Sequence, residues 1–185
     1  MKTISDIIDD IIKAEGGYSD NRNDTGGKTM YGITESVARA SGYSGDMRDL
    51  PLDTAKKIYF QQYVAAPGFD RVMKLSPVIA AELVDTGVNM GPSTAGKFLQ
   101  RSLNAFNNNG SLWPDVVVDG GIGDKSISAL ESYLKAKAPQ GGERVLLFTL
   151  NSLQCVRYIE LSEARKENES FAYGWIHNRV ESQLH

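Results

Sequence analysis

Residues 3–17 read TISDIIDDIIKAEGG, and this stretch decides how the fold begins. Its isoleucines recur at intervals of three and four residues, which is the spacing of side chains on one face of an α-helix. Thr3 or Ser5 can accept hydrogen bonds from the first free backbone N–H groups, and Gly16-Gly17 supplies the left-handed conformation at which helices commonly end. The stretch therefore predicts an amphipathic helix over residues 3–14 with its apolar face against a core.

Glu15, at the end of this helix, is the first candidate for chemistry. It follows the last isoleucines at helical spacing, so it falls on the apolar face. Desolvation there and the negative end of the helix dipole both disfavour a carboxylate, and we expect them to raise its pKa. A carboxylic acid that keeps its proton near neutral pH is suited to general acid catalysis. Position in the helix alone favours the alternative, a frayed helix end whose Glu points to water.

Residues 18–32 are rich in Asn, Asp, Gly and Thr, and they predict a small β-hairpin with Thr29–Tyr31 as a strand and Thr25–Lys28 as the turn. Asp24 lies in the polar loop, where it can remain ionised, and Thr29 lies on the returning strand. Both side chains would face Glu15 across a cleft. Inverting cleavage of a glycosidic bond uses such a set, because one carboxyl protonates the leaving oxygen while a second orders a water about 6.5–9.5 Å away. Thr29 would help to hold that water.

Helical patterns account for most of the remaining chain, so we predict a mainly α fold with one small β-hairpin lobe beside the site. Expected helices follow Thr34 up to Gly42 and then cover residues 52–66, 77–87, 95–106, 126–137 and 143–166. The last of these is apolar nearly all round at its start, which predicts a buried central element. We divide the chain into residues 1–91, the catalytic part, and residues 92–185, a helical C-terminal part that shares its core.

Composition narrows the classes of function. The 185 residues carry 20 Lys and Arg against 23 Asp and Glu, a net charge of −3 that argues against a sequence-independent nucleic-acid binder. One cysteine and two histidines provide neither internal disulfides nor a zinc site, and we expect no metal and no cofactor. The apolar runs are too short for membrane insertion, and the acidic N-terminus does not read as a signal peptide. We therefore expect synthesis in a cytoplasm.

The same stretches resemble glycoside hydrolase family 108, phage-type muramidases that cut peptidoglycan. The resemblance rests on Glu15-Gly16-Gly17-Tyr18 followed by Asp24, Gly26, Gly27, Thr29, Tyr31, Gly32 and Ile33. It continues through residues 55–63, 85–91 and 99–100, and residues 119–130 resemble the predicted peptidoglycan-binding region of such proteins. The Glu, Asp and Thr pattern is also similar to that of phage lysozymes, although four residues separate Asp24 from Thr29 where those enzymes usually have five.

This resemblance implies a lysozyme-like fold and hydrolysis of the β-1,4 bond between N-acetylmuramic acid and N-acetylglucosamine, with peptidoglycan glycan strands as the partner. It implies Glu15 as the general acid, with Asp24 and Thr29 as residues that position water or stabilise charge. It further implies the endolysin of a phage or prophage, a monomer made in the bacterial cytoplasm that reaches the periplasm or cell wall through a separate holin.

Three further residues are candidates for contact with the substrate. Tyr18 and Tyr31 could stack on sugar rings or pack the hairpin against the helical body, and the two interpretations are evenly matched. Asn89 could hydrogen-bond an acetamido group, although a local, turn-stabilising role is favoured. We interpret Asp85 as a surface residue near a helix end.

The net charge gives no long-range attraction to an anionic cell wall. Either a local basic patch docks the protein, with Lys97, Arg101 and Arg179 as candidates, or its affinity for the wall is weak. Three alternative functions stay open. A lytic transglycosylase would use one Glu and release 1,6-anhydro products, a non-catalytic peptidoglycan-binding module would bind walls without cleaving them, and a secreted toxin would share the chemistry of an endolysin.

Overall fold

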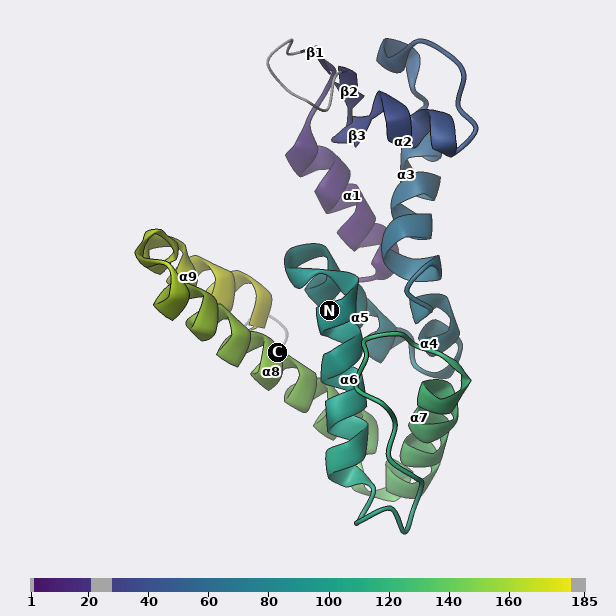
Figure 1. Cartoon of the computed structure of the whole chain (residues 1–185), viewed down its shortest axis with the longest axis vertical. Coiled ribbons are helices and arrows are strands. Elements are labelled where there is room, and N and C mark those ends of the chain that lie inside the picture. Colours follow the sequence, from purple (N-terminus) through teal and green to yellow (C-terminus); the bar gives the residue numbers. More distant parts are fainter. Residues whose placement is uncertain (1, 21–27, 181–185) are drawn as a thin grey trace.

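The computed structural model describes residues 2–20 and 28–180, and this part of the chain is mainly helical with one small sheet (Figure 1), which confirms the fold class expected from the sequence. The N-terminal elements are α1 Ile4–Glu15, β1 Ser19–Asp20, β2 Lys28–Met30, β3 Ile33–Thr34, α2 Glu35–Ala40, the 3-10 helix η1 Met47–Asp49, α3 Leu52–Phe60 and the π-helix η2 Gln61–Ala65. There follow α4 Phe69–Leu75, α5 Pro77–Met90, α6 Pro92–Phe106, α7 Asp124–Lys137, η3 Ala138–Gln140, α8 Gly142–Ala164, η4 Lys166–Asn168, α9 Glu169–Trp175 and the π-helix η5 Ile176–Val180.

Helix α1 forms where the isoleucine pattern predicts it, and Thr3 is its cap. The Thr3 hydroxyl accepts a 3.2 Å hydrogen bond from the Asp6 backbone N–H, and the Asp6 carboxylate accepts a 2.9 Å bond from the Thr3 backbone N–H. This reciprocal capping box satisfies two backbone donors that a helix start otherwise leaves unpaired. At the other end Gly16 takes a φ of 77° and ends the helix. The capping signal and the glycine therefore set both ends of α1 locally.

The strands form a small antiparallel sheet in the order β1-β2-β3. Met30 pairs with Ile33, so Tyr31 and Gly32 form a two-residue turn, and both have positive φ values, 54° and 75°. Two positive φ values are what a type I′ hairpin turn requires. The strand predicted over residues 29–31 is therefore shifted by one residue, because Tyr31 belongs to the turn. The other predicted turn, at residues 25–28, lies outside the described residues apart from Lys28.

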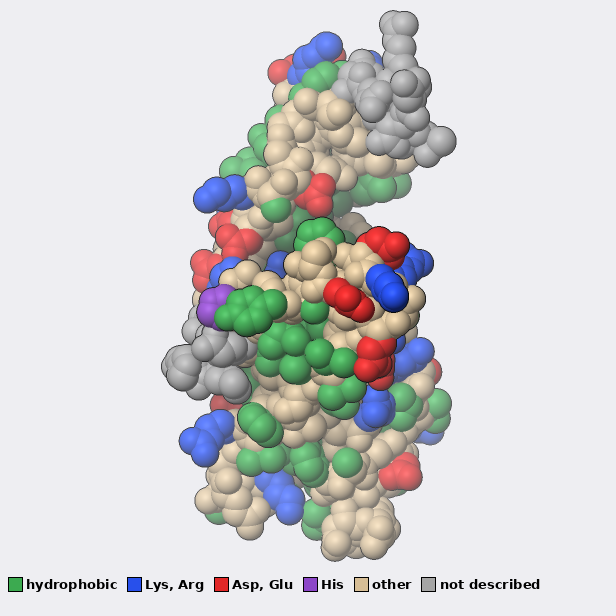
Figure 2. Space-filling view, turned by 90° about the vertical axis from the view of Figure 1, so that its left-hand side faces the viewer, with side chains coloured by type: hydrophobic (Ala, Val, Ile, Leu, Met, Phe, Trp, Pro, Cys, Tyr) green, Lys and Arg blue, Asp and Glu red, His purple; other side chains and the backbone are tan. Residues whose placement is uncertain are grey.

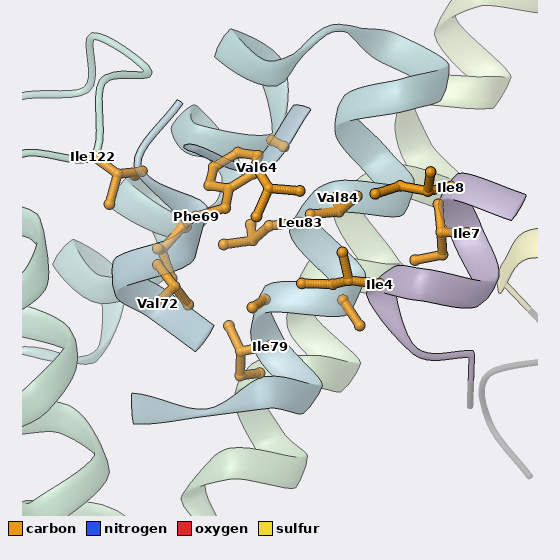
Figure 3. Packing of buried hydrophobic residues seen from close by; sticks show 14 of the residues in the cluster. Ile4, Ile7, Ile8, Val64, Phe69, Val72, Ile79, Leu83, Val84 and Ile122 are labelled. Carbon is orange, nitrogen blue, oxygen red and sulfur yellow. The ribbon is translucent and has the colours of Figure 1, made fainter. Parts of the chain in front are cut away.

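One hydrophobic core contains residues from both halves of the chain. Its centre is α5, which is buried without interruption from Ile79 to Gly87, while α1, α4, α6 and α8 pack around it. Figure 3 shows Ile4, Ile7 and Ile8 of α1 directed toward α5. Burial of each such side chain contributes about 1.5–3 kcal/mol before chain entropy is counted. This packing holds α1, and with it the sheet, against the helical body.

The longest helix, α8, is not the buried central element that its sequence predicts. Val145 and Phe148 are 46% and 60% exposed, whereas Leu146 and Leu150 are buried in the core. The apolar run is misleading because only one face of α8 packs against α5 and α6, and the helix then extends away from the body beside α9 (Figure 1). None of the described helices combines the length and the hydropathy needed to cross a membrane.

Candidate active site

A cleft of about 290 Å³ opens between α1, the last turns of α5 and η5. Figure 2 shows a recess on this side of the molecule, between the upper part, which carries the small sheet, and the helices below it. Five ionisable side chains line the cleft, and two pairs of them are bonded: Lys2 to Asp10 at 2.6 Å, and Arg179 to Asp85 at 2.7 Å. The fifth ionisable side chain, Glu15, has no ion-pair partner among the described residues that line the cleft.

Glu15 is exposed, so the expectation that it lies desolvated on the apolar face of α1 is wrong. The helical spacing does continue to this residue, but the last turn of α1 borders the cleft instead of the core, as both Ala14 and Glu15 line it. The side chain nevertheless lies close to the hairpin turn. A Cβ added to Gly32 would lie 2.7 Å from Glu15 Cγ and 2.8 Å from Glu15 Oε2. The turn between β2 and β3 therefore packs directly on Glu15, and a glycine is needed there.

Tyr59 of α3 ties that turn to the helical body. Its hydroxyl donates a 2.8 Å hydrogen bond to the Tyr31 carbonyl. Burial raises the pKa of Tyr59 to about 12, and the neighbouring Glu15 adds to the rise because its negative charge opposes a phenolate. The Tyr59 hydroxyl thus remains a hydrogen-bond donor at neutral pH. Three elements, α1, the β2–β3 turn and α3, together position the Glu15 carboxyl at the cleft.

Asp85 is buried, so its interpretation as a surface residue is wrong. One carboxylate oxygen accepts a 2.7 Å bond from Arg179 Nη1, and the other accepts a 3.3 Å bond from Gln154 Nε2. Arg179, one of the candidate docking cations, is therefore already paired with a carboxylate, although its side chain is 37% exposed. The sequence offers no signal for this pair, because 94 positions separate its two members.

A second buried carboxyl, Glu82, lies one helical turn before Asp85. Burial raises the pKa of Glu82 to about 7, and the negative charge of Asp85 adds to the rise. Nearby, Asn151 Oδ1 and Gln154 Oε1 are buried acceptors with no hydrogen-bond partner among the described residues. A protonated Glu82 supplies a donor in this cluster that an ionised one lacks. In the described part of the chain, no three His, Cys, Asp or Glu side chains gather as metal ligands would.

Of the catalytic residues predicted from the sequence, the structure places only Glu15 among the described residues of the cleft lining. Thr29 lies in β2, where it is half-buried and pairs with Ser19 on one side and Thr34 on the other. Asp24 lies outside the described residues. The roles of Asp24 and Thr29 remain predictions.

The predicted substrate-binding residues divide between the hairpin and the cleft. Tyr18 and Tyr31 are half-buried against the core, and the Arg48 guanidinium lies 4.7 Å from the centre of the Tyr18 ring, so it covers one face of that ring. Asn89 is exposed and lines the cleft. Its amide nitrogen donates a 2.7 Å bond to the Asp85 carbonyl, which is the kind of local backbone contact that the sequence favours.

Comparison with known proteins gives two family matches. The model described as Glycosyl hydrolase 108 matches residues 8–91, and the model described as Predicted Peptidoglycan domain matches residues 94–180. The solved structure of Brucella abortus SagA is similar, with a TM-score of 0.57 and 22% sequence identity, over 97% of this chain and 92% of that chain. At this identity the likeness shows a shared fold. No curated protein matches the chain significantly.

Proposed function

We propose that this chain is a muramidase that hydrolyses the β-1,4 bond between N-acetylmuramic acid and N-acetylglucosamine, because residues 8–91 match the model described as Glycosyl hydrolase 108. The glycosyl hydrolase and peptidoglycan domains together support a lytic enzyme that acts on peptidoglycan. The observation that carries the finer proposal is the position of Glu15. Its carboxyl is exposed at the cleft, has no ion-pair partner among the described lining residues, and lies against the turn that contains Gly32.

In this proposal Glu15 is the general acid. A glycan strand in the cleft brings its glycosidic oxygen to the carboxyl, which donates its proton as the bond between C1 and that oxygen breaks. A water adds to C1 and loses a proton, so the products are two shorter strands, one of them with a new reducing end on muramic acid. Asp24 and Thr29 order the water, and Tyr18 and Tyr31 stack on sugar rings.

Asp85 lines the same cleft but is not proposed as the second catalytic carboxylate. Both of its oxygens already accept hydrogen bonds, one from Arg179 and the other from Gln154. The Asp85 side chain is also only 10% exposed, whereas a general base must come within hydrogen-bond reach of the attacking water. This engagement supports a positioning role for Asp85 and leaves Asp24 as the candidate for water activation.

The test is analysis of the products released from purified peptidoglycan sacculi. The wild type should release muropeptides that end in reducing muramic acid, and Glu15→Gln should be slower by about 10²–10⁴-fold, the usual contribution of a general acid. Glu131→Gln, which changes an exposed Glu on α7, is the matched control and should keep full activity. Ends in 1,6-anhydromuramic acid would indicate a transglycosylase instead. Wall binding with no released product from the wild type would indicate a binding module.

We also propose that the protein is the endolysin of a phage or prophage. It is made in the bacterial cytoplasm, acts as a monomer, and reaches the wall in the periplasm or beyond through a holin. Cells that express it should lyse only when a holin is expressed with it. Lysis without a holin would contradict this route, and an adjacent immunity gene in place of a holin gene would indicate a secreted toxin.

A further inference from the structure

Asp85 joins three segments of the chain that are far apart in sequence. It lies on α5, it accepts a hydrogen bond from Gln154 of α8, and it forms an ion pair with Arg179 of η5. Its side chain is only 10% exposed, whereas that of Arg179 is 37% exposed and lines the cleft. A buried carboxylate beside a second buried carboxyl, Glu82, requires a compensating cation. Arg179 supplies that cation, and it comes from the segment that matches the peptidoglycan domain.

The backbone carbonyl of Asp85, and at longer range its carboxylate, determine which way the Asn89 amide faces. Asn89 Nδ2 lies 2.7 Å from the Asp85 carbonyl oxygen and 3.4 Å from Asp85 Oδ2. Both partners can only accept hydrogen bonds, so the nitrogen must be the atom that faces them. Asn89 Oδ1 is then left as an acceptor on an exposed side chain in the cleft, with no hydrogen-bond partner among the described residues.

The charges of the cleft limit what this acceptor can bind. Both described cations of the lining, Lys2 and Arg179, are already paired with carboxylates, and Glu15 remains without an ion-pair partner. The described lining therefore offers no unpaired cation to the carboxylates of the stem peptide. An uncharged ligand group with an N–H donor fits better, and each N-acetyl sugar of a glycan strand carries one in its acetamido group.

We propose that Asn89 Oδ1 accepts a hydrogen bond from the acetamido N–H of an N-acetyl sugar, and that Arg179 acts through Asp85 as the positioning residue for this contact. The proposal rests on the glycan-cleaving function proposed above and adds the feature of the substrate that this end of the cleft recognises. It also gives the C-terminal segment a role in the cleft itself, because its Arg179 holds the carboxylate to which Asn89 is bonded.

The test measures binding in a Glu15→Gln background, so that cleavage does not interfere. The probes are a synthetic tetrasaccharide of alternating N-acetylmuramic acid and N-acetylglucosamine, and 2-deoxy analogues that each lack one acetamido group. Calorimetry should show that adding Asn89→Ala raises the Kd of the tetrasaccharide roughly 3- to 10-fold, as expected for one neutral hydrogen bond. For the analogue that lacks the acetamido group contacted by Asn89, the Asn89→Ala substitution should leave the Kd unchanged.

Arg179→Gln should show the same dependence on the ligand, and Arg179→Lys should recover most of the lost affinity because it keeps the charge beside Asp85. A merely structural defect would weaken every ligand alike. Arg157→Gln breaks an exposed ion pair with Glu160 on α8 and is the matched control, with no expected change in any Kd. Should Arg179→Gln fail to fold, the exposed Asn89 still decides whether the acetamido contact exists, and Arg179→Lys tests the positioning.

The failure of this inference can be told from the failure of the proposed function. If the wild type releases no reducing ends from sacculi, the proposed function is wrong. If it does release them, but Asn89→Ala weakens the tetrasaccharide and every analogue equally, or weakens none of them, only the acetamido contact is wrong. An equal loss for all ligands in Arg179→Gln, without recovery in Arg179→Lys, would overturn its positioning role.

Discussion

Replacement of Gly32 by alanine tests whether the β2–β3 turn positions the catalytic candidate. The new methyl carbon would lie 2.7 Å from Glu15 Cγ, 2.8 Å from Oε2 and 2.9 Å from Cβ, well inside van der Waals contact. Relief requires the carboxyl to move by about 1 Å, and a misplacement of that size costs about 10²-fold in rate. We therefore expect kcat/KM for sacculi to fall about 100-fold, which corresponds to about 2.7 kcal/mol of transition-state stabilisation.

The same substitution also strains the backbone, because Gly32 has a φ of 75°. Alanine there should destabilise the fold by about 1–2 kcal/mol. Gly42→Ala is the matched control, since Gly42 has a φ of 88° and an added Cβ would meet nothing within 4 Å. Thermal unfolding should show similar losses of stability in both variants, while turbidity clearing should be impaired only in Gly32→Ala. If Gly32→Ala kept activity within threefold of Gly42→Ala, the turn would not position Glu15.

Three other perturbations follow from the described contacts. Glu82 has a folded pKa of about 7 against 4.5 for the free group, so its stabilising effect is complete below pH 4.5 and is lost as the pH rises toward 7. Denaturant titrations should show that the free energy of unfolding of the wild type decreases by about 3 kcal/mol across that range, whereas that of Glu82→Gln does not. Equal pH profiles for the two proteins would refute the raised pKa of Glu82. Tyr59→Phe removes the hydrogen bond to the Tyr31 carbonyl, which should lower the free energy of unfolding by about 1 kcal/mol and the rate of wall cleavage several-fold. An unchanged rate would show that this hydrogen bond does not help to position Glu15. Gln100→Leu leaves the Gly120 N–H without its 2.8 Å acceptor, so calorimetry should show a loss of about 1–3 kcal/mol in the free energy of unfolding, with kcat unchanged. A loss of less than about 0.5 kcal/mol, which is typical of a surface substitution, would contradict this prediction.

The sequence predicts best those features whose partners are close in the chain. The capped helix that ends at Gly16, the helix that begins at Pro77 and the helix after Thr34 all form as expected, because caps and turn residues act over three or four positions. Glu15 stands out for the same reason, as it lies where a helix ends and a polar loop begins. Its exposure was mispredicted, since helical spacing says which face a residue occupies but not whether another element covers that face.

Residues 3–17 alone determine an amphipathic helix with a carboxyl at its end, because side-chain periodicity and capping depend only on residues that are close in the chain. Only the tertiary structure decided that this carboxyl borders a cleft, that Gly32 packs on it, and that Asp85 is buried against Arg179. Such contacts join segments far apart in the chain, and burial depends on how those segments pack together. No local pattern contains that information.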